Sequence, residues 1–127
     1  ARSDVAGAVV EDAETIDGHK LVVVNQPDAS PDDLRALAFQ IREKVDSGVG
    51  VMGSNNAGKA ALVCFVTEDL VKAGVSAGEI TAVAARVVSG GGSRDPQLAQ
   101  AGGPNGNEIE AALEAARAAA RDALGGA

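Results

Sequence analysis

The sequence has very few aromatic and redox-active residues. Its 127 residues include no Trp and no Tyr, two Phe, one Cys and one His. A single cysteine excludes an internal disulfide, which favours a protein of the reducing cytoplasm. A single histidine excludes a metal site built from several histidines, and two Phe cannot form an aromatic platform for single-stranded nucleic acid. We therefore expect no metal and no cofactor in this chain.

Long apolar segments and targeting signals are also missing. The longest apolar run is far shorter than a membrane span, and the first residues show no basic flank followed by an apolar stretch. We expect neither a signal peptide nor a membrane anchor, and no membrane partner. The lack of an initiator Met indicates a fragment cut from a longer protein. We expect residues 1–17 to be the remnant of a preceding helix or linker, and residues 18–127 to form a single globular domain.

Basic charge is scarce and unevenly distributed. The formal net charge is −7, and the net charges of residues 1–46, 47–103 and 104–127 are −5, 0 and −2. A general nucleic-acid binder needs clustered Lys and Arg, so this balance argues against one. The glycine-rich part of the middle segment lies where the chain is least acidic, and any RNA contact should be directed at the backbone and shape of the RNA.

Apolar periodicity and capping residues predict an α/β fold. We expect a small mixed sheet of three to five strands packed with helices and closed by a C-terminal helix. A remnant helix over residues 4–14 is followed by strands over 19–25, 49–52 and 59–66, a helix from Pro31 that ends at Gly48, and helices after Ser76 and Asn107. The alanine-rich seam of the last helix either packs on the sheet or meets another helix in a dimer. Strand, helix and strand imply a parallel crossover, and residues 53–58 imply a β-hairpin.

The segment from Gly53 to Ala60 resembles a nucleotide-binding P-loop but lacks two features that a P-loop requires. Ala60 stands where a Ser or Thr hydroxyl would hold Mg²⁺. The residues that follow also continue as a strand, whereas a P-loop leads into a phosphate-binding helix. Both departures favour a hairpin.

Residues 88–103 form the most distinctive stretch, with five glycines, one arginine and little core-forming bulk. Glycine tolerates positive φ, so successive N–H groups of Gly90, Gly91 and Gly92 could turn toward one anion beside the fixed charge of Arg94. Phosphate would suit such a loop. The alternative is a tight connection between two helices, in which the glycines only permit close packing.

The same stretch resembles a known family. The glycine run, Arg94, the segment Leu98-Ala99-Gln100-Ala101-Gly102-Gly103 and the closing helix are similar to the DHH-associated domain family, in the branch that forms the C-terminal domain of alanyl-tRNA synthetase. That resemblance implies a domain that helps to hold alanine tRNA at its outer corner, linking aminoacylation to editing by other domains of the synthetase. The expected RNA-facing residues are Gly90, Gly91, Gly92, Ser93, Arg94 and Gln100, with Lys59 and Arg86 as outer phosphate contacts.

Two alternatives remain from the sequence. The last helix could make the chain a homodimerisation or assembly module of the synthetase. The chain could also be the substrate-binding half of a DHH phosphoesterase, which the ending Ala-Gln-Ala-Gly-Gly disfavours. The sequence contains no Asp-His-His triplet, so we expect no phosphodiester hydrolysis and no catalytic residue in this part of an enzyme.

Overall fold

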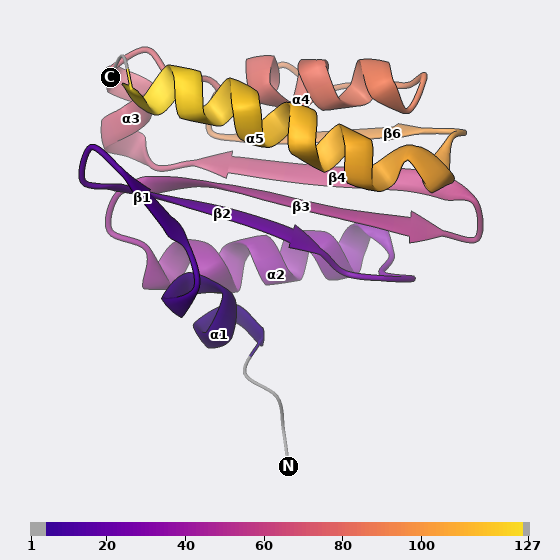
Figure 1. Cartoon of the computed structure of the whole chain (residues 1–127), viewed down its shortest axis with the longest axis horizontal. Helices are drawn as coiled ribbons and strands as arrows, with labels where there is room; N and C mark the ends of the chain where they lie inside the picture. Colours follow the sequence, from indigo (N-terminus) through magenta and orange to yellow (C-terminus); the bar gives the residue numbers. More distant parts are fainter. Residues whose placement is uncertain (1–4, 126–127) are drawn as a thin grey trace.

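A central sheet lies between two layers of helices (Figure 1). The computed structural model describes residues 5–125. Its elements are, in chain order, α1 (Val5–Glu11), β1 (Glu14–Ile16), β2 (His19–Asn25), α2 (Pro31–Lys44), β3 (Gly48–Asn56), β4 (Lys59–Val66), α3 (Glu68–Lys72), α4 (Ala77–Val87), β5 (Gly91–Gly92), β6 (Leu98–Gly103), the 3₁₀ turn η1 (Gly106–Glu108) and α5 (Ile109–Gly125). The expected α/β fold with a closing C-terminal helix is confirmed.

The described part of the chain forms a sheet of six strands in the order β1-β2-β3-β4-β6-β5. Strands β2 and β3 are parallel and connected through α2, whereas every other neighbouring pair is antiparallel. The expected three to five strands are therefore too few. The strands that the sequence did not reveal are β1, β5 and β6. They are short or rich in Gly and Ala, so they lack the β-branched run that marks β2.

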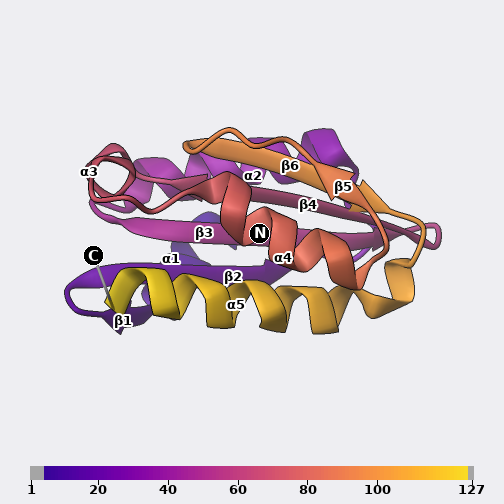
Figure 2. The ribbon, with the colours of Figure 1, turned by 90° about the horizontal axis from the view of Figure 1, so that it is seen from above.

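The two faces of the sheet carry different helices (Figures 1 and 2). Helices α1 and α2 cover one face, here called the α2 face, and helices α4 and α5 cover the other, here called the α4 face. Each face has its own apolar core. The seam of α5, which includes Ala112, Ala116 and Ala120, is fully buried in the core of the α4 face. Of the two expectations for this seam, packing within the chain is the one observed.

The start of α2 follows its sequence signals closely. The Ser30 hydroxyl accepts a hydrogen bond from the Asp33 N–H, and the Asp33 carboxylate accepts one from the Ser30 N–H, which completes a capping box. The helix ends at Lys44, before the expected Gly48, because Val45 is already extended and Gly48 begins β3.

Both ends of the described chain differ in detail from the sequence expectations. Only part of the expected helix over residues 4–14 is helical, because α1 ends at Glu11 and Glu14 begins a strand that pairs with β2. The domain boundary after residue 17 stays a prediction. At the other end, Asn107 lies inside a 3₁₀ turn rather than capping the last helix, which begins at Ile109.

Residues 53–60 form a hairpin without any P-loop character. Strand β3 continues to Asn56, which pairs with Lys59, so the connection is only two residues long. Ala57 and Gly58 have φ values of 54° and 87°, the left-handed pair that a type I′ hairpin turn requires. The Asn55 side-chain oxygen accepts a hydrogen bond from the Gly58 N–H at 2.9 Å.

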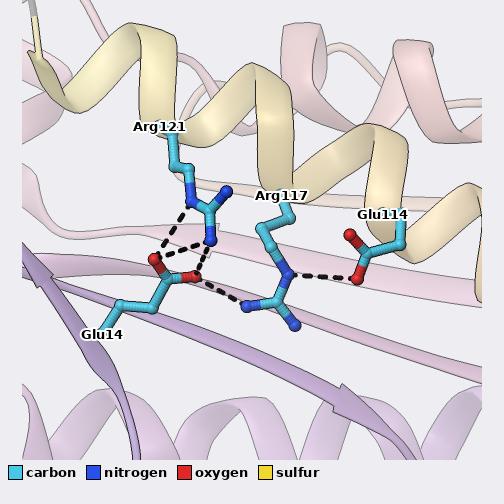
Figure 3. A network of polar contacts seen from close by, with 4 residues as sticks. All are labelled: Glu14, Glu114, Arg117 and Arg121. Atoms are coloured by element: carbon cyan, nitrogen blue, oxygen red, sulfur yellow. Dashed lines mark hydrogen bonds and ion pairs between the residues drawn. The ribbon is translucent and has the colours of Figure 1, made fainter.

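A network of charges ties β1 to α5 (Figure 3). The carboxylate of Glu14 accepts hydrogen bonds from Arg117 at 2.7 Å and from Arg121 at 3.0 Å. Arg117 also contacts Glu114, three residues earlier on the same helix, at 3.3 Å. The two contacts of Glu14 join residues more than 100 positions apart in sequence. They hold the first described strand against the last helix.

Replacing Glu14 by Gln is expected to lower the free energy of unfolding by about 0.5–1 kcal/mol at neutral pH, since the side chain is 28% exposed and solvent weakens the pair. The hydrogen bond from Arg117 lowers the pKa of Glu14 from its usual 4.5. A carboxyl group with a lowered pKa stabilises the fold above its unfolded pKa, and this contribution is lost as acid protonates it. The deficit of the variant should therefore shrink as the pH falls below 4.5.

Urea unfolding at neutral and acid pH measures this difference. The matched control is Glu114→Gln, because Glu114 is 71% exposed and should contribute less. A deficit of Glu14→Gln that stays constant into the acid range would contradict an electrostatic origin.

Candidate nucleic-acid interface

A groove of about 240 Å³ lies between α4 and the glycine-rich segment that follows it. Here, residues 89–97 are called the arm. Backbone and small side chains form most of the groove wall, and two arginines stand at its rim. The lining residues are Gly78, Ala82, Ala85, Arg86, Gly90, Gly91, Gly92, Ser93 and Arg94.

The two arginines are free to meet an anion. Arg86 lies in the last turn of α4 and Arg94 in the arm, and both are exposed. Within residues 5–125, neither guanidinium forms an ion pair. The neighbouring Asp95 makes no ion pair with Arg94; its Oδ1 accepts hydrogen bonds from the backbone N–H groups of Gln97 and Leu98. The groove therefore has two guanidinium groups that no described carboxylate pairs with.

The glycines of the arm are needed for space rather than for positive φ. Among the described residues of the arm, only Ser89 has a positive φ, at 58°. A Cβ on Gly90 would collide with the carbonyl oxygen of Gly102, and one on Gly92 would collide with that of Gln100. The expectation that Gly90, Gly91 and Gly92 turn successive N–H groups toward one anion through positive φ is therefore wrong. In addition, the Gly90 N–H already donates to the Ala85 carbonyl at 2.9 Å.

The close packing predicted by the alternative interpretation is thus observed, and it shapes the groove. Gly91 and Gly92 form β5, the edge strand of the sheet, which pairs with β6. The Ser93 N–H donates to the Gln100 carbonyl, and the Ser93 hydroxyl accepts from the Gln100 N–H. At its far end the arm is held against α4, where the Pro96 carbonyl accepts from the Ala77 N–H. These contacts fix the arm beside the helix that bears Arg86.

Gln100 and Lys59 lie on the other side of the sheet from this groove. In β6, Ala99 belongs to the core of the α4 face and Leu98 packs against the core of the α2 face, so alternation directs Gln100 to the α2 face. The same alternation in β4 directs Lys59 to the α2 face. There Lys59 lines a separate, mainly apolar cleft of about 460 Å³ beside Pro31 and Pro104.

The structure therefore brings together six of the eight residues expected to face RNA. Gly90, Gly91, Gly92, Ser93, Arg94 and Arg86 line one groove, while Gln100 and Lys59 do not. Sequence reasoning missed Gly78, Ala82 and Ala85, the small residues of α4 that form the groove wall. Their spacing along one helical face was the available signal, since small residues let another chain segment approach a helix closely. A Cβ on Gly78 would lie 2.7 Å from the backbone of Arg94.

The other chemically reactive side chains described below are buried or hydrogen-bonded to neighbouring side chains. Cys64 is buried, which raises the pKa of its thiol to about 12. Ser47 donates to the carboxylate of Asp69, and because its single proton is used there, the His19 Nδ1 must be the donor in its 2.7 Å contact with Ser47. Hydrogen bonds from Ser47 and then Thr67 lower the pKa of Asp69. These groups lie outside the lining of the groove.

The described residues offer no obvious metal site and no membrane span. Between residues 5 and 125, no three His, Cys, Asp or Glu side chains come together as metal ligands. In the same part of the chain, no helix has the length and apolar character needed to cross a bilayer.

Comparison with known proteins identifies the family. The model of the DHHA1 domain matches residues 17–122, which is most of the chain. The chain belongs to the DHHA1 domain family. The expected resemblance to the DHH-associated domain is thereby confirmed, and the arm and β6 described above lie within the matched range.

Relatives of this DHHA1 domain include alanine–tRNA ligases. That of Alkaliphilus oremlandii is 38% identical over 112 residues, which cover 88% of this chain and 13% of the ligase. That of Trichormus variabilis is 33% identical over 126 residues, covering 98% of this chain and 14% of the ligase. The chain therefore corresponds to a small part of such an enzyme.

A solved structure has the same fold. The C-Ala domain from Aquifex aeolicus alanyl-tRNA synthetase superposes with a TM-score of 0.74 at 24% identity, covering 90% of this chain and 98% of that one. At this level of identity the likeness establishes the fold of the DHHA1 domain.

Proposed function

We propose that this chain is the part of an alanyl-tRNA synthetase that helps to hold alanine tRNA, with aminoacylation and editing carried out by other domains in the cytoplasm. The observation that carries the proposal is the groove between α4 and the arm, where Arg86 and Arg94 stand without acidic partners. The likeness to alanine–tRNA ligases supports the choice of RNA.

The contact proposed here is with the RNA backbone. A guanidinium group presents several N–H donors to phosphate oxygens, and two such groups beside a narrow wall of glycine backbone suit a phosphate chain. The described residues around the groove include no aromatic side chain on which a base could stack. Binding should therefore depend strongly on salt and only weakly on sequence.

Replacing Arg94 by Ala is expected to weaken the binding of alanine tRNA about five- to tenfold at low salt, because one charge-assisted contact with phosphate is lost. The slope of log K against log salt concentration should also fall in magnitude by about one. Fluorescence anisotropy of labelled tRNA across a salt series measures both quantities. An unrelated tRNA shows how much of the binding is independent of sequence.

The matched control is Arg42→Ala. It removes the same charge from the C-terminal turn of α2, at a residue that lines neither the groove nor the Lys59 cleft. Equal affinity and equal slope in Arg94→Ala and the unaltered chain would show that the groove does not hold tRNA.

Self-association of the chain stays a prediction. The alanine seam of α5 that suggested it is already buried against the sheet, so a dimer would need another surface. Sedimentation at several concentrations measures it.

A further inference from the structure

Asn105 joins the two ends of the ribbon formed by β5 and β6. Its side-chain amide donates to the hydroxyl of Ser89 at 2.9 Å, and its backbone N–H donates to the carbonyl of Val88 at 3.3 Å. Val88 and Ser89 lie where the chain leaves α4 for the arm, and Asn105 lies just after β6. One residue therefore holds the entry to the ribbon and its exit together.

The conformation of Ser89 depends on its surroundings. Its φ of 58° is in the left-handed region, which residues other than glycine seldom occupy. Such a conformation persists where neighbouring contacts hold it. The Ser89 hydroxyl accepts the hydrogen bond from Asn105 that supports this conformation. This turn sets the direction in which the arm leaves α4, and hence the place of Arg94 relative to Arg86.

The next residue extends the connection to the hairpin turn between β3 and β4. The Gly106 N–H donates to the Gly58 carbonyl at 2.9 Å. Gly106 packs so closely there that a Cβ would lie 2.6 Å from the carbonyl carbon of Gly58. Gly58 belongs to the hairpin turn that immediately precedes Lys59. Residues 105–106 thus link the arm with its two-arginine groove to the turn beside the Lys59 cleft.

We propose that Asn105 is a positioning residue for RNA binding. It fixes the groove of Arg86 and Arg94 relative to Lys59. The two arginines on the α4 face and Lys59 on the α2 face can then meet phosphates of one RNA at the same time. This inference rests on the proposed function. Holding two contact points in one geometry before binding removes an ordering cost that a loose arm would have to meet during binding.

The decisive variant is Asn105→Ala, with Asn107→Ala as its matched control. Asn107 is an exposed asparagine two residues further on, outside the ribbon contacts. We expect Asn105→Ala to weaken alanine tRNA binding about two- to tenfold, the range for one lost hydrogen bond. The salt slope should stay unchanged, because no cation is removed. Amide hydrogen exchange should accelerate at residues 91–94. Asn107→Ala should leave the affinity and the exchange rates unchanged.

A double-mutant cycle with Ser89→Ala tests whether the two side chains act as a pair. The double variant should bind no more weakly than the weaker of the two single variants. Ser89 is exposed, so Ser89→Ala alone carries the test if Asn105→Ala does not fold.

The results separate this proposal from the proposed function. If Arg94→Ala weakens tRNA binding while Asn105→Ala binds like Asn107→Ala, the positioning role is wrong and tRNA binding stands. If tRNA does not bind, or binds without any dependence on Arg94, the proposed function is wrong and the positioning role for RNA is overturned with it.

Discussion

Replacing Phe65 by Ala is expected to lower the free energy of unfolding by about 3–5 kcal/mol. Phe65 is fully buried in the core of the α2 face, on β4. Its ring lies over Gly50, its partner on β3, which has no side chain to fill the space that truncation would open. Urea unfolding followed by circular dichroism measures the loss, because the chain has neither Trp nor Tyr as a fluorescent reporter.

The other phenylalanine is the natural control. Phe39 is 48% exposed on α2, and Phe39→Ala should change stability by no more than about 0.5 kcal/mol. Gly50→Ala extends the test, because a Cβ there would collide with the Phe65 ring. Its cost of about 1–3 kcal/mol should largely disappear in the Phe65→Ala background. Strictly additive losses would show that the ring does not occupy the space over Gly50.

Replacing Gly90 by Ala is expected to destabilise the chain by about 1–3 kcal/mol, whereas Gly91→Ala should be nearly neutral. The two glycines are adjacent and differ in their surroundings. A Cβ on Gly90 would collide with the backbone of Gly102, which cannot rotate away as a flexible side chain could, while a Cβ on Gly91 would meet open space. The ribbon must therefore separate to accept Gly90→Ala.

The same pair of variants tests the role assigned to the arm glycines. Urea unfolding gives the difference in stability, and amide exchange locates the disturbance in β5 and β6. Equal stability of Gly90→Ala and Gly91→Ala would mean that Gly90 is not packed closely against the backbone of Gly102.

The sequence was most informative where local chemistry decides the structure. The capping box of Ser30 and Asp33, the β-branched run of β2 and the apolar stripe of α5 each point to one element, and each element is present. In β6 the signal is absent, because Leu98 to Gly103 contains no β-branched residue. Its extended form comes from pairing with β4, a contact made across some thirty residues of intervening chain.

The part of the candidate site that depends on local sequence was predictable. Arg94, Ser93 and the glycines are adjacent in sequence, and their proximity needs no knowledge of the fold. The separation of Gln100 and Lys59 from them follows from side-chain alternation, which can be applied only after β6 is known to be a strand and its pairing with β4 is known. The need for glycine at positions 90 and 92 also comes from the backbone of the neighbouring strand β6, which the sequence of the arm does not reveal.

The division of the interior into two cores bears on how this chain can change without losing its fold. Side chains of the two cores are separated by the sheet, so substitutions on opposite faces should contribute almost independently to stability. A stabilising change beneath α2 can then compensate for a costly one near the arm without altering the groove. Positions of the groove that tolerate a side chain can therefore change, provided that the core beneath α2 supplies the lost stability, whereas Gly90 and Gly92 stay fixed by the backbone beside them.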